Sequence, residues 1–573
     1  NVLRELKRMD EAAASYQQAL RHRPGFVEAL HNLGMTHIAL QQPELALACL
    51  ARCLRIDPRH LGASGQYGVA LLALKRPREA LDYFLRVVKS SPNDAEAHYW
   101  SGNALLGMDR PEEALASYLR AAHINPDIPE IHYNLACVLV DLERQEESLA
   151  AFERALELRP DYVQALYNLG GALQDLRRHE EAASTYERLL SIAPDHRYTL
   201  GQLINCRRYG CDWAHYTEYV EDLDRSMQEG NPRDMPFSYL SVSGDPARQR
   251  RCAQVFTARH YPSSPRPLWA GQHYRHDRLR VAYVSGDFRD HALCYLLAGV
   301  FEAHERQRFE TFALSLRPPE ASAMGKRVAA AFEHFVDVSK LSDREVAARM
   351  HELEVDIAVD LMGYTENNRT GIFAERPAPI QVNYLGYPGT MGAGYIDYII
   401  ADEFVIPENY RQHYSEHVVW LPECFQGNDE RRVIAGHAPS RAESGLPDSG
   451  FVFCAFNNSH KLTPAFFDIW MRLLIRVPES VLWLVSNDVE VERNLIAEAE
   501  KRGVAPQRLV FSPRIAYAEH LARLRLADLF LDTLPFNAGT TASDALWAGV
   551  PVLTCAGEAF AARMAGSLLQ ALG

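Results

Sequence analysis

The first 200 residues carry a pattern of small, large apolar and polar positions that repeats every 34 residues. In each period a small residue, which lets two helices approach closely, is followed four positions later by a large apolar one. A proline follows twelve positions after the small residue. The prolines are Pro24, Pro58, Pro92, Pro126, Pro160 and Pro194, the small residues Ala12, Ala46, Ala80, Ala114, Ser148 and Ala182, and the large ones Tyr16, Leu50, Phe84, Tyr118, Phe152 and Tyr186. The pattern predicts stacked pairs of antiparallel helices that cannot bury their apolar faces alone.

A period of 34 residues is the length of a tetratricopeptide (TPR) unit, so residues 1–200 are predicted to form a TPR superhelix. The concave face of such a superhelix usually receives an extended peptide. Polar or aromatic residues recur at one first-helix position and are candidates for lining it: Asn32, Gln66, Trp100, Asn134 and Asn168. Asn side chains can bond a peptide backbone without reading its sequence, although solvated surface residues are the alternative.

The period is lost after Pro194, and residues 201–275 are predicted to be a helical connector that ends in the Pro- and Ser-rich segment YPSSPRPLW. From Leu279 short β-branched runs alternate with helical segments, as in an α/β fold with mainly parallel strands. A polar stretch over 423–449 separates two sets of such runs. We therefore expect two Rossmann-like lobes, over 276–437 and 438–573, with a cleft between them.

Composition narrows the classes of partner. The chain has 573 residues, 47% apolar and 23% charged, which is ordinary for a globular protein of several domains. No apolar run reaches about 18 residues and no signal-peptide pattern is present, so no membrane partner is expected. Ten scattered cysteines without a CxxC pair favour the cytoplasm, and a net charge of −14 argues against general nucleic-acid binding. The chain begins inside a repeat without Met and stops at Gly573 in the second lobe, which predicts a fragment.

The most specific segment is LFLDTLPFNAGTTASDALWAGVPVLT, residues 529–554. It predicts a strand ending near Leu534, a tight loop through Gly539, and a helix that begins around Thr540. A helix N-terminus at the carboxyl end of a parallel strand offers free N–H groups to an anion, and Thr540 and Thr541 add hydroxyl donors. Asp544 is placed to accept hydrogen bonds from ribose hydroxyls. The alternative is an ordinary helix cap with a solvated Asp.

This segment, together with the TPR array, resembles the O-linked N-acetylglucosamine (O-GlcNAc) transferase family. Further segments resemble the same family: VAYVSGDFRDH (281–291), RPAPIQVNYLGYPGTMGAGYIDYIIAD (376–402), FNNSHKLTP (456–464) and YAEHLARLRLADLFLDT (517–533). The resemblance implies a GT-B glycosyltransferase with two Rossmann-like lobes. It also implies inverting transfer of GlcNAc from UDP-GlcNAc to Ser or Thr hydroxyls of polypeptides, which would be held by the TPR groove.

The resemblance also implies roles for individual residues. Lys461 would neutralise the departing UDP, and His291 would take the acceptor proton with Asp287 orienting it or acting itself. His260 matches a further active-site histidine. The remaining nucleotide-contacting positions are Asn458, His520, Gly539, Thr540, Thr541 and Asp544. Gly539 replaces a histidine, Tyr517 a lysine and Asn458 a glutamine of the animal enzymes, which suggests a distant, bacterial member.

Two apparent metal motifs are interpreted as coincidence. His413, Glu416 and His417 have HxxEH spacing but directly precede a strand instead of lying within a long helix. The Asp-x-Asp pair Asp222 and Asp224 lies in the connector and not in a lobe. We therefore expect a metal-independent reaction with no cofactor besides the nucleotide-sugar donor.

Two alternatives stay open on sequence alone. One is a TPR-bearing protein O-fucosyltransferase that uses GDP-fucose, and the other is a TPR scaffold whose lobes are inactive. The sequence does not identify the acceptor proteins, the general base or the oligomeric state, although TPR superhelices can form homodimers through their convex faces.

Overall fold

The computed structural model describes residues 2–573 and divides into two compact units between Pro194 and Asp195. The division comes slightly before the predicted end of the repeats at residue 200. Each unit is described separately below. No helix among the described residues is long and apolar enough to cross a membrane.

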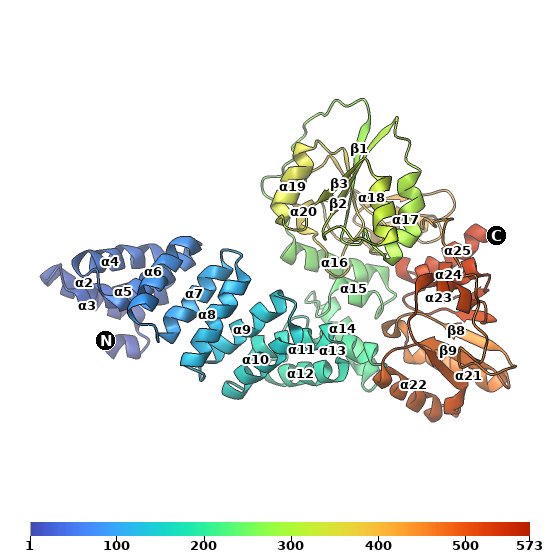
Figure 1. The fold of residues 1–573 in the computed structure, drawn as a ribbon, viewed down its shortest axis with the longest axis horizontal. Coiled ribbons are helices and arrows are strands. Elements are labelled where there is room, and N and C mark those ends of the chain that lie inside the picture. Colours follow the sequence, from blue (N-terminus) through green and yellow to red (C-terminus); the bar gives the residue numbers. More distant parts are fainter. Residues whose placement is uncertain (1) are drawn as a thin grey trace. The chain divides into compact units, whose positions relative to one another are not determined.

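The first unit consists of helices that pack as successive antiparallel pairs (Figure 1), which confirms the predicted TPR array. The two helices of a pair approach closely at a recurring glycine in the first helix. A Cβ on Gly68, Gly102 or Gly170 would lie within 2.7 Å of the aromatic ring sixteen residues later. The helices are α1 (Val2–Glu5), α2 (Met9–His22), α3 (Val27–Ala39), α4 (Pro43–Ile56), α5 (Leu61–Ala73), α6 (Pro77–Ser90), α7 (Ala95–Leu106), α8 (Pro111–Ile124), α9 (Pro129–Asp141), α10 (Gln145–Leu158), α11 (Val163–Asp175) and α12 (His179–Ile192).

The turn inside each helix pair holds a non-glycine residue in the left-handed region. These residues recur with the same period and have φ between 56° and 59°: Lys7, Gln41, Lys75, Asp109, Glu143 and Arg177. The next residue is an arginine in five of these turns, and it forms an ion pair with a glutamate three positions later, as Arg144 does with Glu147. The turn geometry is therefore as periodic as the apolar faces.

The second unit begins with the connector, whose helices are α13 (Thr199–Tyr209), α14 (Tyr216–Gln228), α15 (Pro236–Tyr239) and α16 (Pro246–His260). The helical type predicted for this segment is confirmed up to His260. The connector packs on both lobes, since Trp213 between α13 and α14 contacts Phe467 in the second and Thr257 of α16 bonds the Tyr364 hydroxyl in the first. The connector is thus an integral layer of the second unit.

Residues 279–420 form a seven-stranded parallel sheet of order β3-β2-β1-β4-β5-β6-β7. Apolar clusters cover both of its faces, which explains the continuous apolar runs of its central strands. Its elements are β1 (Leu279–Ser285), α17 (Ala292–Glu302), β2 (Phe309–Ser315), α18 (Ala323–Ala331), β3 (His334–Asp337), α19 (Asp343–Glu352), β4 (Ile357–Asp360), α20 (Gly371–Ala374), β5 (Ile380–Asn383), β6 (Tyr398–Ala401), the 3₁₀ helix η1 (Glu408–His413) and β7 (His417–Trp420).

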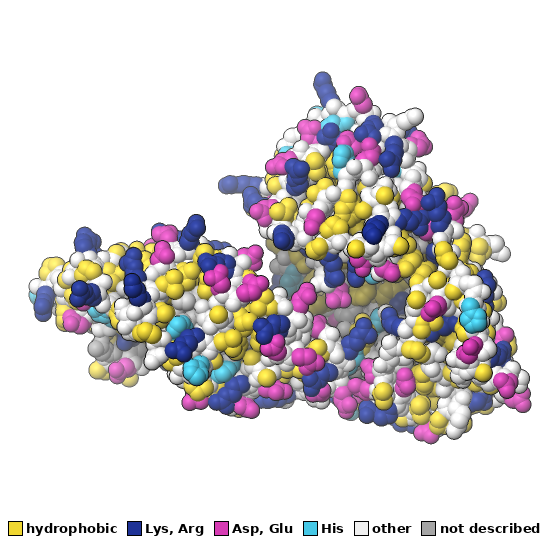
Figure 2. All heavy atoms as spheres, in the orientation of Figure 1, with side chains coloured by type: hydrophobic (Ala, Val, Ile, Leu, Met, Phe, Trp, Pro, Cys, Tyr) yellow, Lys and Arg dark blue, Asp and Glu magenta, His cyan; other side chains and the backbone are white. Residues whose placement is uncertain are grey.

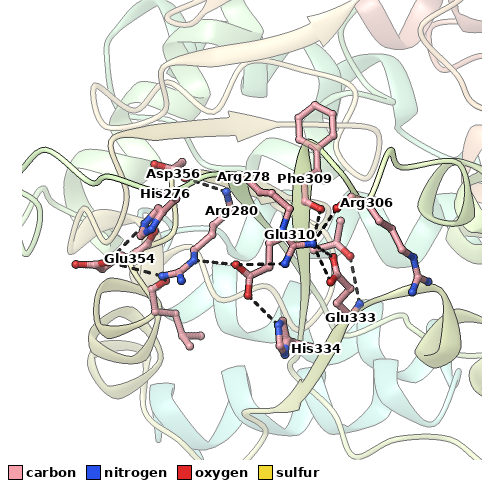
Figure 3. Close-up of polar contacts among 12 residues, drawn as sticks. His276, Arg278, Arg280, Arg306, Phe309, Glu310, Glu333, His334, Glu354 and Asp356 are labelled. Carbon is pink, nitrogen blue, oxygen red and sulfur yellow. Dashed lines mark hydrogen bonds and ion pairs between the residues drawn. The ribbon is translucent and has the colours of Figure 1, made fainter.

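An ion-pair network ties the amino ends of the first-lobe strands together (Figure 3). Glu310 of β2 lies 3.0 Å from the Arg280 Nε of β1 and 3.0 Å from the His334 Nε2 of β3. Arg278 reaches Glu333 at 2.9 Å. The network lies at the edge of the sheet opposite to the carboxyl ends.

Residues 452–553 form a five-stranded parallel sheet of order β10-β9-β8-β11-β12. Two parallel Rossmann-like lobes were predicted and are confirmed. The elements of the second lobe are β8 (Val452–Ala455), η2 (Ser459–Lys461), α21 (Pro464–Arg476), β9 (Val481–Val485), α22 (Val489–Lys501), η3 (Pro506–Arg508), β10 (Leu509–Ser512), α23 (Tyr517–Leu524), β11 (Leu529–Leu531), α24 (Thr540–Ala548), β12 (Val552–Leu553), η4 (Phe560–Ala562) and α25 (Met564–Leu572).

The last segment of the second lobe returns to the first. Phe560 and Met564 belong to the apolar core of the first lobe, and Ser567 of α25 donates to the buried Asp402 at the end of β6. The lobes are therefore joined by the returning C-terminal segment as well as by the linker over 423–449.

Candidate active site

Both sheets reverse their strand order at one point, and the candidate residues lie at these points. In the first sheet the order reverses between β1 and β4, and the loop after β1 contains Asp287 and His291. In the second it reverses between β8 and β11, whose following loops contain Lys461 and Gly539. Ligands of open α/β sheets bind at the carboxyl ends of the strands at such switch points. The surface is hollowed where the two lobes face each other (Figure 2).

Lys461 lies at the end of η2 and reaches across to the loop after β11. Its Nζ donates to the Asn537 carbonyl at 2.9 Å and lies 3.9 Å from the centre of the Phe536 ring. Burial lowers the pKa of Lys461 to about 8, although the Asp532 carboxylate opposes this shift. The Lys461 ammonium is thus bonded to the loop after β11.

Asp532 shapes the loop that leads into α24. One carboxylate oxygen accepts from the Thr533 and Ala538 amides at 2.7 Å, and the other accepts from the Thr554 hydroxyl at 2.6 Å. These bonds end β11 at Leu531, so the prediction that the strand ends near Leu534 is wrong. Burial raises the pKa of Asp532 to about 6.

The helix predicted to begin around Thr540 is confirmed, with Gly539 as the residue before its first turn. The Thr541 hydroxyl donates to the Asn457 Oδ1 at 2.7 Å, and thereby joins the loops after β8 and β11. A Cβ at Gly539 would lie 3.3 Å from the Gln426 Oε1, so the linker closely approaches this helix end. The free N–H groups and the positive end of the helix dipole at Thr540 face the loop that Lys461 orders.

Asp544 is buried in α24 and is bonded by protein side chains. Its Oδ1 accepts from the Tyr517 hydroxyl at 2.6 Å and lies 3.1 Å from the Arg432 Nη1 of the linker. Burial raises the pKa of Asp544 to about 6, although Tyr517 and Arg432 oppose this rise. Its predicted ribose contact stays a prediction, since the carboxylate already serves an internal ion pair.

His291 is the N-cap of α17 and lies close to Asp287. Its Nδ1 accepts from the Leu293 amide at 3.3 Å and lies 3.7 Å from the Asp287 Oδ2. Burial lowers the pKa of His291, so the ring is neutral near pH 7. The Leu293 bond requires Nδ1 without a proton, which places the proton of the neutral ring on Nε2. The other neutral tautomer, with the Nδ1 proton directed towards Asp287, gives up the Leu293 bond and leaves Nε2 as a proton acceptor. The first lobe thus brings these two predicted residues together.

The other predicted residues lie in different surroundings. His260 is the last residue of α16, and its Nε2 lies 3.0 Å from the Tyr198 hydroxyl. The His260 ring also packs on Phe256, so the contacts of His260 are mainly with connector residues. Asn458 accepts from Arg514 beside η2. His520 in α23 accepts from Arg523 and packs on Phe456, and burial lowers its pKa to about 4.

Two structural residues around the site were missed. Asp532 directly follows an apolar run, which places it at the carboxyl end of a predicted strand. This position could have identified it, because ligands of open α/β sheets bind at the carboxyl ends of the strands. Arg208 contacts the carbonyl of His460, next to Lys461. It lies in the connector, 252 positions before His460, and no sequence pattern points to it.

The HxxEH segment has a structural explanation. Glu416 is buried and accepts from the Thr390 hydroxyl and the Met391 amide, both at 2.6 Å. Asp222 pairs with Arg225 and Arg233, whereas Asp224 pairs with Arg248. Each carboxylate therefore serves an internal contact.

Comparisons with known proteins identify the family and agree with the fold. The model of glycosyl transferase family 41 matches residues 264–438 and 435–573, and tetratricopeptide models match 3–64, 66–129 and 133–197. The probable UDP-N-acetylglucosamine–peptide N-acetylglucosaminyltransferase SEC of Arabidopsis thaliana is 41% identical over 301 residues, which are 52% of this chain and 31% of that protein. The corresponding Caenorhabditis elegans enzyme is 28% identical over 52% of this chain and 35% of its own length.

One solved structure extends the likeness beyond the lobes. A mutant O-GlcNAc transferase of Thermobaculum terrenum shares 26% identity, with a TM-score of 0.51, and the match covers 90% of this chain and 85% of that one. By contrast, the chain spans about a third of the length of the curated relatives named above. Since the family model covers more than half of the chain and the likeness of structure includes the repeats, the chain belongs to glycosyl transferase family 41.

Proposed function

We propose that this protein transfers GlcNAc from UDP-GlcNAc to Ser or Thr hydroxyls of polypeptides, with inversion and without a metal ion. The observation that carries the proposal is the position of Lys461, whose ammonium is held over the loop that leads into the N-terminus of α24. A nucleoside diphosphate is the anion that a lysine and a helix terminus at a strand switch point suit best. The names of the relatives supply the identity of the sugar.

Lys461 and the first N–H groups of α24 would stabilise the negative charge that develops on the departing UDP. They would thereby take the part that a divalent cation plays in metal-dependent transferases. Inversion requires the acceptor hydroxyl to attack from the face opposite to the leaving group. His291, in the neutral tautomer that directs its Nδ1 proton to Asp287 instead of accepting from the Leu293 amide, would accept the hydroxyl proton at Nε2.

The acceptor polypeptide would lie in the TPR groove. Asn134 donates its amide to the Tyr99 hydroxyl at 3.0 Å, and Asn168 donates to the Tyr133 hydroxyl at 3.1 Å. This ladder fixes both side chains and leaves their carbonyl oxygens to accept from peptide N–H groups. The recognition would therefore be directed at the backbone of the acceptor.

Calorimetric titration with UDP and with GDP tests the donor site. We expect UDP to bind and Lys461→Ala to weaken it at least tenfold, since a buried counter-charge is removed. Lys501→Ala, which removes an exposed lysine paired with Glu498, is the matched control and should leave binding unchanged. Selective binding of GDP would instead support fucosyl transfer, and the absence of nucleotide binding would support a scaffold.

Transfer itself is tested with radiolabelled UDP-GlcNAc and a peptide library. We expect label on Ser or Thr, loss of label with Lys461→Ala, and no loss when EDTA is added. Abolition by EDTA with recovery on adding Mg²⁺ would contradict the metal-independent part of the proposal alone.

A further inference from the structure

The connector buries a charged residue beneath the turn that carries Lys461. Arg208, in the last turn of α13, is fully buried, and its Nη2 donates to the backbone carbonyl of His460. His460 and Lys461 are consecutive residues of η2. Fully buried arginines are rare unless their charge is paired, so this contact needs an explanation.

The same end of α13 holds η2 through further contacts. The Ser459 hydroxyl donates to the Tyr209 carbonyl at 2.8 Å, and the His460 ring packs on the Tyr209 ring at 4.7 Å. Asn494 of α22 donates to the Gly210 carbonyl at 2.9 Å, which anchors the end of α13 to the second lobe. Each residue of η2 before Lys461 is therefore bonded or packed against the connector.

The Arg208 guanidinium is not placed for maximal stability. Its Nε and Nη1 are buried without a hydrogen-bond partner, as is the Oδ2 of the nearby Asp234. Each unpaired buried polar atom destabilises the folded state, and an apolar side chain of similar volume at a buried charged site is often no less stable. Among the residues that the structure describes, the one hydrogen bond of the Arg208 side chain is to the His460 carbonyl, next to Lys461.

We infer that Arg208 is a positioning residue that holds the 3₁₀ turn η2, and through it the Lys461 ammonium, over the loop after β11. The inference rests on the proposed function for the importance of Lys461, but the position of the amine can be measured without any substrate. Burial already holds the pKa of Lys461 near 8, and a loosened turn would admit water to the amine.

The test compares Arg208→Met and Arg208→Lys with the unmodified protein. The rate of Lys461 acetylation, followed by mass spectrometry between pH 6.5 and 10.5, gives the pKa of its amine. We expect Arg208→Met to raise this pKa towards the usual lysine value of about 10.4 and to weaken UDP binding at least tenfold. Arg208→Lys keeps the charge and should restore part of both. Arg225→Met, which removes an exposed connector arginine paired with Asp222, is the matched control.

A folded Arg208→Met variant with an unchanged Lys461 titration would overturn the inference. If that variant does not fold, Arg208→Lys and Ser459→Ala decide, because the latter removes only the bond from η2 to Tyr209 and should shift the titration in the same direction. Unchanged titration in both would equally overturn it. If the unmodified protein binds no UDP, the proposed function fails while the titration still decides the role of Arg208.

Discussion

At the scale of single residues, burial shifts the pKa values of the site's charged groups, and hydrogen bonds and nearby charges partly reverse these shifts. Burial raises the pKa of Asp532 and Asp544 to about 6 and lowers the pKa of Lys461 to about 8. In each case a nearby group of the opposite charge opposes the pKa shift that burial causes. The site is therefore poised so that its charges change within a few pH units of neutrality.

Lys461 should make UDP binding depend on pH. In the free protein its pKa is near 8, so the amine loses its proton, and with it the attraction for the diphosphate, as pH rises through that value. We expect the UDP dissociation constant, measured by calorimetry from pH 7 to 9.5, to increase above pH 8.

Lys461→Arg is the control for this prediction, since a guanidinium stays charged over the range. Its UDP affinity should be flat between pH 7 and 9.5, even where the geometry makes it weaker overall. A pH dependence in the arginine variant equal to that of the unmodified protein would assign the effect to another group.

Glu310 should make the stability of the first lobe depend on pH. Burial alone would raise its pKa, but hydrogen bonds from Arg280 and His334 outweigh burial and hold it below the ordinary value (Figure 3). A lowered folded-state pKa contributes stability above the unfolded pKa of about 4.3, which is lost as pH falls through the folded value.

We therefore expect Glu310→Gln to reduce the free energy of unfolding at pH 7 by about 1–3 kcal/mol, since a charge-assisted bond is lost. The difference from the unmodified protein, measured by urea denaturation, should shrink below about pH 4. Glu305→Gln, in an exposed pair with Arg308, should change stability by less than about 0.5 kcal/mol at both pH values. A constant difference for Glu310→Gln across the range would show that lost packing, and not charge, is responsible.

At the scale of elements, the repeats could be predicted in detail, because the residues that recur every 34 positions determine both the helices and their packing against each other. The two helices of a pair approach closely, since a Cβ on Gly102 of α7 would lie 2.6 Å from the Tyr118 ring of α8. The short β3 was not predicted, since its segment HFVD has only half-buried or exposed residues and thus no apolar run. The end of β11 was predicted wrongly because the Asp532 carboxylate, a tertiary feature of the loop, captures the amides that would extend the strand.

The left-handed turns of the array offer a test of element stability. Glu143 has φ 58°, a conformation that costs an L-residue roughly 1–2 kcal/mol relative to the right-handed region and that glycine adopts freely. We expect Glu143→Gly to leave the free energy of unfolding unchanged or to raise it by up to about 1 kcal/mol, after the entropy cost of glycine.

The matched control is Glu153→Gly, an exposed position inside α10, where glycine should cost about 1 kcal/mol. Circular dichroism during thermal unfolding distinguishes the two variants. Equal destabilisation by both would mean that the Glu143 side chain contributes more than its backbone geometry costs.

At the scale of the molecule, the sequence was sufficient to predict a repeat array followed by two lobes with parallel sheets, but not the contacts that join the lobes. Lys461 and Gly539 lie in the segments after β8 and β11, which parallel-strand topology brings together, so their proximity could be predicted. By contrast, Arg432 belongs to a stretch that resembles a plain linker, yet it pairs with Asp544 inside α24. Such contacts depend on how segments distant in the sequence meet in the folded unit, and no local pattern encodes that.

The stacked pair Tyr295 and Tyr517 connects the two lobes beside the site. Tyr295 follows His291 in α17, and its ring lies 3.8 Å from that of Tyr517, with 21° between the planes. Its hydroxyl donates to Asp290, whereas the Tyr517 hydroxyl donates to Asp544. The loop that holds His291 and the helix that begins at Thr540 are thus linked through two rings.

We expect a double-mutant cycle of Tyr295→Leu and Tyr517→Leu to give a coupling of about 0.5–1.5 kcal/mol, the usual range for an aromatic pair. UDP affinity and the free energy of unfolding are measured for all four proteins. Tyr517→Phe keeps the ring and removes only the bond to Asp544, so it should retain most of the coupling with Tyr295→Leu. Additive effects of the two leucine variants would show that the rings contact without cooperating, and each lobe would then reach its geometry independently of the other.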